Sequence, residues 1–197
     1  MGIEKQGSNP TGFIGKIVGQ MMNKYHTSFY VNYLKNNLPD NDSKILDIGC
    51  GGGKFLKYLS EINDSYILYG LDHSPEMIKL SKKINTQAIA QNRLKIIQGS
   101  VSNVSIENDY LDLITAFETV QFWPDIEKSF SEIARVLLNG GRFIIINRYP
   151  PEDSKWWNMA KIKSDKDYID KLKNAGFGRV TIDLKFKNGW IVVNATK

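Results

Sequence analysis

The spacing of apolar residues divides the chain into a helical N-terminal segment and a longer region in which strands and helices alternate. Apolar and aromatic side chains recur at helical spacing between Phe13 and Leu34, and Leu38-Pro39-Asp40 ends this pattern. Residues 1–42 are therefore predicted to form a helical cap on a core or a lid over a ligand, two interpretations that are compatible. From Lys44 onward, short apolar runs alternate with amphipathic stretches.

The region from residue 43 to residue 197 is predicted to be an α/β core. Five apolar runs predict strands, at residues 45–48, 66–71, 94–98, 111–117 and 143–146. Four amphipathic stretches predict helices, at residues 54–60, 75–84, 126–137 and 165–175. The third of these helices is expected to stop at Asn139-Gly140-Gly141. Because strands and helices alternate, we predict a doubly wound, mainly parallel sheet.

The C-terminal residues depart from this alternation. Val180, Ile182 and Leu184 alternate with polar residues, as in a half-exposed strand that continues to Phe186. Asn188-Gly189 is a strong signal for a two-residue hairpin turn, and residues 190–195 follow as a second strand. The predicted sheet thus has seven strands and ends in an antiparallel hairpin, which an ordinary dinucleotide-binding fold lacks.

Composition restricts the class of protein further. The 197 residues are enough for one domain, and 42% hydrophobic with 24% charged residues is typical of a globular chain. No apolar run approaches a membrane span, and residues 1–10 lack the apolar core of a signal peptide. The one cysteine excludes a disulfide framework and no metal-ligand spacing is visible, so we expect a cytoplasmic protein without a bound metal. The net charge of +5 permits an acidic partner without indicating nucleic acid.

A glycine-rich turn follows the first predicted strand. Asp47-Ile48-Gly49-Cys50-Gly51-Gly52-Gly53 lies between that strand and the next helix, where glycines let the backbone turn sharply and approach a ligand. Asp72 ends the second strand, about 20 residues beyond the glycines, the position from which a carboxylate accepts hydrogen bonds from ribose hydroxyls. The alternatives are a plain strand-to-helix turn and a helix-capping role for Asp72.

These features resemble the class I S-adenosylmethionine-dependent methyltransferases, most closely the group related to ubiquinone and menaquinone C-methyltransferases. The resemblance runs from about Tyr25 to Lys197 and rests on five loose motifs in consistent order. Besides the glycine turn and Tyr69 to Met77, the motifs are Gln98-Gly99-Ser100-Val101, Asp109 to Phe117, and Arg135 to Gly141. It implies a Rossmann-like methyltransferase fold, one domain over residues 1–197, and S-adenosylmethionine as the cofactor, with S-adenosylhomocysteine as its product.

The resemblance also implies which residues bind the cofactor. Those near its methionyl part are Asp47, Gly49, Gly51 and the backbone of Phe117. Those near its ribose and adenine are Asp72, His73, Met77, Ser100 and Val101. Ser100 stands where the family usually has an aspartate, and a hydroxyl accepts a hydrogen bond more weakly than a carboxylate.

The methyl acceptor is expected at the carboxyl ends of the fourth and fifth strands. Glu118 lies there and would act as a general base if it is buried, or else as a solvated loop acid or an anchor for the lid. Arg148 would pair with an acidic acceptor or cap the fifth strand. Tyr25 and His26, in the aromatic N-terminal segment, are further catalytic candidates, although packing and surface histidines are commoner.

The predicted reaction is direct displacement of the methyl group onto a small-molecule acceptor. A nucleic-acid substrate is disfavoured, because Cys50 lies inside the glycine turn and Ala116-Phe117-Glu118-Thr119 lacks the Asn/Asp-Pro-Pro-aromatic motif of amino-methylating DNA enzymes. The alternatives are an RNA or protein methyltransferase that uses the lysines between residues 161 and 173, and a non-catalytic cofactor-binding module. The glycine spacing and the terminal hairpin argue against a nicotinamide-dependent oxidoreductase. An oligomer is possible, and the sequence does not identify the acceptor.

Overall fold

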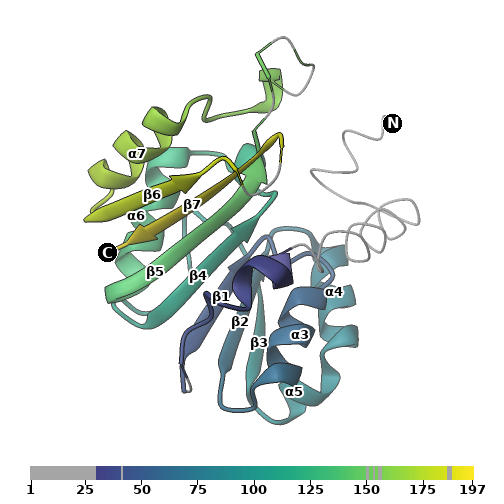
Figure 1. Cartoon of the computed structure of the whole chain (residues 1–197). Helices are drawn as coiled ribbons and strands as arrows, with labels where there is room; N and C mark the ends of the chain where they lie inside the picture. Colours follow the sequence, from purple (N-terminus) through teal and green to yellow (C-terminus); the bar gives the residue numbers. More distant parts are fainter. Residues whose placement is uncertain (1–29, 41, 150, 153, 155–156, 186–187) are drawn as a thin grey trace. The chain divides into compact units, whose positions relative to one another are not determined.

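The computed structural model describes residues 30–40, 42–149, 151–152, 154, 157–185 and 188–197. The chain divides into two compact units, with the boundary between Ser100 and Val101. The two units carry the seven strands of a mixed sheet that includes a C-terminal antiparallel hairpin, so the predicted fold class is confirmed (Figure 1). The organisation as one domain stays a prediction.

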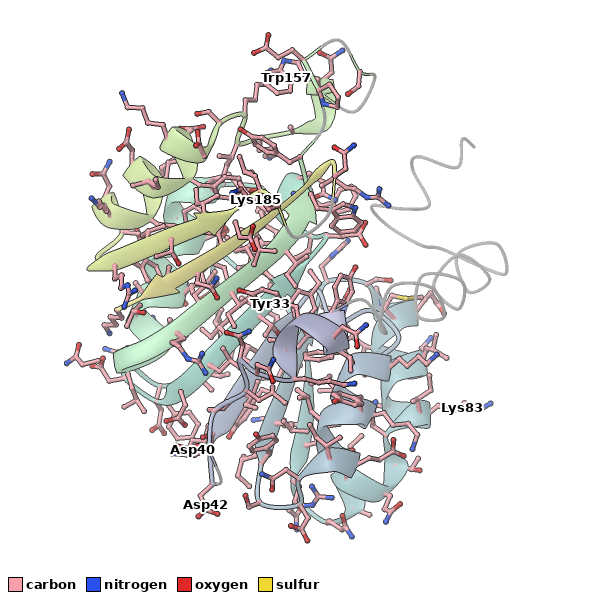
Figure 2. The ribbon with its side chains drawn as sticks, viewed as in Figure 1. Tyr33, Asp40, Asp42, Lys83, Trp157 and Lys185 are labelled. Carbon is pink, nitrogen blue, oxygen red and sulfur yellow. The ribbon has the colours of Figure 1, made fainter. Side chains whose placement is uncertain are left out.

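The first unit is a three-stranded parallel sheet with helices packed against it. Its strands, in the spatial order β3-β2-β1, are β1 (Lys44–Ile48), β2 (Ile67–Asp72) and β3 (Leu94–Gln98). Its labelled helices are α3 (Lys54–Ile62), α4 (Pro75–Ile84) and α5 (Thr86–Ala90). Because the strands are parallel and in register, with Asp72 opposite Gln98, their carboxyl ends lie at one edge. Figure 2 shows Asp40 and Asp42 at the opposite end, just before β1.

A local cap begins α4, whereas packing against the sheet holds α3. Pro75 occupies the first turn of α4, and Ser74 caps it by accepting a hydrogen bond from the Met77 backbone N–H at 3.4 Å. The apolar face of α3, which includes Leu56, is buried against β2. A Cβ at Gly70 would lie 2.5 Å from Leu56 Cδ1, so glycine in β2 is what lets α3 approach the sheet this closely.

The second unit holds the other four strands, two of which form the hairpin. Its strands, in the spatial order β4-β5-β7-β6, are β4 (Leu111–Phe117), β5 (Leu137–Arg148), β7 (Trp190–Thr196) and β6 (Arg179–Asp183). β4 pairs with β5 in parallel, whereas β7 is antiparallel to both β5 and β6. Its helices are α6 (Ile126–Val136), α7 (Asp165–Asn174) and the short 3-10 turns η1 (Val120–Phe122) and η2 (Trp157–Met159).

Aromatic side chains form the centre of the second unit. Phe143 on β5 contacts three other rings, those of Trp123, Phe130 and Phe177, at centroid distances of 6.4, 6.1 and 6.0 Å. Trp123 is 3% exposed, so its ring belongs to this core and does not face solvent. Offset and edge-to-face ring pairs of this kind add to the stabilisation from burial alone.

An ion pair on α6 holds the polar connection that precedes β4. Arg135 donates to the backbone carbonyls of Val104 and Ile106 at 2.9 and 3.0 Å, and it forms two hydrogen bonds with the Glu132 carboxylate. Glu132 in turn accepts from the Val104 backbone N–H at 2.7 Å. The guanidinium of Arg135 lowers the pKa of Glu132 through these hydrogen bonds, so the pair stays charged while it anchors the connection.

The start of β5 corrects one prediction. The sequence predicts that Asn139-Gly140-Gly141 terminates α6, yet α6 ends at Val136 and these three residues belong to β5. Gly140 N donates to the Lys197 carbonyl at 3.0 Å, and Lys197 N donates to the Gly141 carbonyl at 3.1 Å. Gly140 and Gly141 therefore belong to the strand because Lys197 pairs with them, a partner that no local pattern indicates.

The hairpin turn corrects a second prediction. β6 ends at Asp183 and not near Phe186, and residues 184–189 connect it to β7, so the two-residue turn at Asn188-Gly189 is wrong although the hairpin is confirmed. Lys185 N donates to Asp183 Oδ1 at 2.7 Å, a local turn that ends the strand. Gly189 has a φ of 73° and lies in the longer connection.

The N-terminal cap lies mostly outside the described residues. Residues 1–29, and with them the catalytic candidates Tyr25 and His26, are among those not described. Residues 30–34 are helical, with Tyr30 and Leu34 buried. Tyr66 donates its hydroxyl to the Pro39 carbonyl at 2.7 Å, which holds the connection to β1. Within the described part of the chain, no helix is long and apolar enough to cross a membrane.

Candidate cofactor and acceptor sites

The glycine loop turns back over the end of β2. Gly49, Gly51 and Gly53 all have left-handed backbones, with φ of 70°, 50° and 77°. A residue with a side chain adopts this conformation at a cost of about 1–2 kcal/mol, which explains the glycines at these positions. The Gly49 and Cys50 backbone N–H groups donate to the Leu71 carbonyl at 2.7 and 3.1 Å, so the loop is fixed to the neighbouring strand.

Gly51 leaves open space beside the loop. A Cβ placed there would come only as near as 4.0 Å to another atom within the surroundings that the structure describes, the carbonyl oxygen of Gly49. Open space at a left-handed glycine lets a ligand approach the backbone directly. This is the geometry that the sequence predicts for a loop that binds a nucleoside-containing cofactor.

Asp72 connects the glycine loop to the start of α4. Its Oδ2 accepts from the Gly51 backbone N–H and its Oδ1 from the Ser74 backbone N–H, both at 2.9 Å. The residue is 8% exposed. A carboxylate has about four acceptor sites, so each oxygen can accept a further hydrogen bond from a ligand hydroxyl. His73 lies beside it, with Nδ1 3.8 Å from Oδ1 and more than half of its side chain exposed.

A second buried carboxylate, Asp47, lies on β1 at the base of the loop, 4% exposed. Its charge and that of Asp72 both act on Cys50, the chain's one cysteine. Burial raises the pKa of the Cys50 thiol well above its usual value, and the nearby Asp72 and Asp47 raise it further. Cys50 is therefore a protonated, packed side chain in the folded protein and not a nucleophile.

We expect Cys50 to be nearly inert toward thiol reagents in the folded protein. At about pH 8 the reaction with Ellman's reagent should be at least about 10-fold slower than in guanidinium chloride, because the thiolate is the reactive form and burial blocks access to it. Absorbance of the released thiolate anion measures both rates. Fast stoichiometric reaction of the folded protein would contradict this placement of Cys50.

Asn85 holds the end of the glycine loop through hydrogen bonds. The sequence analysis did not identify this residue as part of the site. Its side-chain amide donates to the carbonyls of Gly53 and Ser81 at 3.0 and 2.9 Å, which joins the end of the loop to the last turn of α4. A Cβ at Gly53 would lie 2.1 Å from Ser81 Oγ, so the loop and α4 are in direct contact. No sequence motif links Asn85 to the glycines.

The remaining predicted cofactor residues are distributed over both units. Met77 is buried in the first turn of α4, and Ser100 is exposed at the end of the first unit. Val101 is buried and Phe117 is half-buried, and both belong to the second unit. The structure thus brings Asp47, the glycines, Asp72 and His73 together around one loop, whereas the contribution of Val101 and Phe117 to the same site stays a prediction.

Glu118 follows β4 in an unusual backbone conformation. Its φ is 53°, a left-handed value that is uncommon for a residue with a side chain and that recurs at functional sites. The Glu118 backbone N–H donates to the Ile146 carbonyl at 2.9 Å, and the Gln121 side chain donates to the Glu118 carbonyl at 2.8 Å. These two bonds fix the residue at the carboxyl end of β4.

Arg148 ends β5 and contacts Glu118. Its Nε donates to Glu118 Oε2 at 3.2 Å, and its Cζ lies 4.2 Å from the centroid of the Trp190 ring. The Glu118 side chain is 11% exposed and that of Arg148 is 54% exposed. Trp190 was not among the predicted site residues, because only the pairing of β7 with β5 brings it opposite Arg148.

Other polar and aromatic residues of the second unit have structural roles or lie elsewhere. Asp125 caps α6 by accepting from the Lys128 backbone N–H at 2.9 Å. Trp157 lies in η2, where Lys163 Nζ is 5.3 Å from its ring centroid, and Figure 2 shows it away from the strands of its unit. Trp156 is outside the described residues. In the described part of the chain, no group of three or more His, Cys, Asp or Glu side chains could hold a metal ion.

Comparison with known proteins identifies the family. A family model described as a methyltransferase domain matches residues 46–145, which include the glycine loop, Asp72 and Glu118. The chain belongs to this family. The resemblance to class I S-adenosylmethionine-dependent methyltransferases is thereby confirmed, whereas Arg148 and Trp190 lie beyond the matched residues of this methyltransferase domain.

Individual relatives agree with this family. The chain is 29% identical over 116 residues to the uncharacterized methyltransferase YcgJ of Bacillus subtilis (strain 168), covering 57% of this chain and 43% of the relative. It is 26% identical over 149 residues to the chloroplastic 2-methyl-6-phytyl-1,4-hydroquinone methyltransferase of Arabidopsis thaliana, covering 72% and 42%. The chain thus spans less than half the length of these two curated relatives. A putative S-adenosyl-L-methionine-dependent methyltransferase of Methanococcus maripaludis has the same fold, with a TM-score of 0.73 at 22% identity over 92% of this chain and 91% of that one.

Proposed function

We propose that this protein transfers a methyl group from S-adenosylmethionine to a small-molecule acceptor by direct displacement. The observation that carries the proposal is the glycine loop with Asp72: a left-handed, open backbone at Gly51 beside a buried carboxylate that retains acceptor capacity. This arrangement fits the ribose of a nucleoside cofactor. The family membership supports the same cofactor, and the quinol methyltransferase among the relatives supports an acceptor of small-molecule size.

The residues of the chain would bind and orient the reactants. Asp72 would accept hydrogen bonds from the ribose hydroxyls, and the buried charge of Asp47 would face the cationic methionyl end. When bound, S-adenosylmethionine would supply an electrophilic methyl group on a sulfonium, whose sulfur would keep the C–S electron pair while an electron pair of the acceptor formed the new bond. The work left to the protein is alignment, which can lower a barrier by about 7–11 kcal/mol.

The acceptor-site candidates that the structure describes, Glu118 and Arg148, belong to the second unit. Glu118, at the carboxyl end of β4, is the catalytic candidate that the structure describes, and its carboxylate pairs with Arg148. Two of the lysines between residues 161 and 173 are used internally: Lys161 donates to the carbonyl of Trp123, and Lys171 pairs with Glu127. These contacts favour a small-molecule acceptor over an RNA acceptor bound by the same lysines.

Calorimetric titration with S-adenosylmethionine and, separately, with S-adenosylhomocysteine tests the cofactor assignment. We expect saturable binding of both and none of NADH. Incubation with S-adenosylmethionine tritiated on its methyl group and a fractionated metabolite extract then tests turnover. The Asp72→Ala variant is the control. Absence of binding to either cofactor form would overturn the proposal, and binding without methyl transfer to any fraction would favour a non-catalytic module.

A further inference from the structure

We propose that the guanidinium of Arg148, held in place by Glu118 and Trp190, recognises an anionic group, a carboxylate or a phosphate, on the methyl acceptor. The inference rests on the proposed function and specifies the chemistry of its acceptor.

The three side chains lie at the ends of three adjacent strands. Arg148 is the last residue of β5 and pairs in register with Trp190, the first residue of β7. Glu118 follows the last residue of β4, and its N–H extends the pairing with β5 by donating to Ile146. In open α/β sheets, ligands bind outside the carboxyl ends of the parallel strands, which is where this cluster lies.

Arg148 is oriented before any ligand arrives. Its guanidinium lies over the Trp190 ring at 4.2 Å, and its Nε is bonded to a carboxylate that is only 11% exposed. An exposed arginine normally loses rotamer freedom when it binds a ligand, and a preformed geometry reduces that loss. Trp190 is buried, so the surface on which the guanidinium stacks is itself fixed.

The ligand-binding edge of the guanidinium is available. The hydrogen bond to Glu118 uses Nε, and no described residue accepts a hydrogen bond from Nη1 or Nη2. With 54% of the side chain exposed, these two nitrogens can form the parallel pair of hydrogen bonds that suits a carboxylate or phosphate. The positive charge of Arg148 also offsets the negative charge of Glu118, which by itself would repel an anion.

This arrangement gives Glu118 a positioning role. Its carboxylate holds Nε, and its left-handed backbone is fixed by bonds to Ile146 and from Gln121. Strained backbone that the surrounding structure holds in place is typical of ligand-binding sites. A cationic acceptor would have to displace Arg148 to reach the same carboxylate, so the cluster favours anionic acceptors over amines.

Four probes that share one aromatic ring test the proposal: benzoate, phenyl phosphate, benzyl alcohol and benzylamine. Each is titrated into the full chain, with and without S-adenosylhomocysteine, while the indole N–H signal of Trp190 is followed by NMR and assigned with Trp190→Phe. We expect saturable shifts with benzoate and phenyl phosphate and none with the neutral or cationic probe. The relative affinities of the two anions show whether a carboxylate or a phosphate is preferred.

Substitutions at Arg148 and at a control arginine separate recognition of the anion from effects on folding. Arg148→Gln should weaken binding of the anionic probes at least about 10-fold, and Arg148→Lys, which keeps the charge without the fork, should give an intermediate loss. Arg179→Gln, at an exposed arginine that begins β6, is the matched control and should bind like wild type. S-adenosylhomocysteine affinity should not change in Arg148→Gln.

The outcomes distinguish this inference from the proposed function. Anion binding that survives Arg148→Gln, equal binding of benzyl alcohol, preference for benzylamine, or no anion binding would each overturn the role of Arg148. Failure of S-adenosylhomocysteine to bind, with Arg148-dependent anion binding intact, would overturn the methyltransferase proposal and leave an anion site at the end of β5.

Discussion

Replacing Asp72 with alanine is expected to weaken S-adenosylhomocysteine binding by about 10- to 150-fold, the largest single effect on the cofactor site. A hydrogen bond to a charged group contributes about 1.5–3 kcal/mol, and Asp72→Ala removes the carboxylate that would hold the ribose. The change also removes the acceptor of the Gly51 and Ser74 backbone N–H groups, so the loop itself loses its connection to α4. Calorimetric titration of variant and wild type measures the effect.

Two further variants make this result specific. Glu76→Ala removes an exposed acid from the first turn of α4, close to Asp72 in the sequence. It should leave S-adenosylhomocysteine affinity within about 2-fold of wild type, since screened surface charges contribute little. Asp72→Asn keeps one carbonyl acceptor but loses the charge and should give an intermediate affinity. The cofactor placement is wrong if Asp72→Ala binds as tightly as wild type while remaining folded.

Replacing Gly53 with alanine is expected to lower the free energy of unfolding by about 2–5 kcal/mol. The new Cβ would lie 2.1 Å from Ser81 Oγ, 2.6 Å from Asn85 Nδ2 and 2.9 Å from Ser81 Cβ. Overpacking of this kind costs about 1–3 kcal/mol, and the left-handed φ of 77° adds about 1–2 kcal/mol. Because Asn85 also holds the Gly53 carbonyl, S-adenosylhomocysteine affinity should fall with stability.

Other glycines of this chain separate the two contributions. Gly140 has a φ of 82° and nothing within 4 Å of a Cβ, so Gly140→Ala should show only the conformational cost. Gly178 has open space and no positive φ, so Gly178→Ala should be neutral or slightly stabilising. Denaturant unfolding followed by circular dichroism measures the free energy of unfolding of the three variants. A Gly53→Ala variant as stable as Gly178→Ala would contradict the packing of the loop on α4.

The sequence by itself determined the features that depend on neighbouring residues. The alternation of strands and helices follows from hydrophobic periodicity, and each helix start with a capping side chain is local, as Ser74 and Asp125 show. The glycine loop and Asp72 could also be predicted, because both lie where a strand ends and glycine readily adopts the left-handed backbone of the loop. A capping bond spans three residues, so a short window contains all of it.

The tertiary structure decided what depends on distant partners. Gly140 and Gly141 belong to β5 because Lys197 pairs with them, and the first residue of that strand, Leu137, pairs with Leu111. The register of the hairpin pairs β6 with β7 only from Arg179 to Asp183. Asn85 meets the glycine loop only after α4 has folded against it. Glu118, Arg148 and Trp190 come from three strands, and only the register of β4, β5 and β7 brings them together. The physical reason is that such contacts are set by strand order and register, which the local pattern of a sequence does not specify.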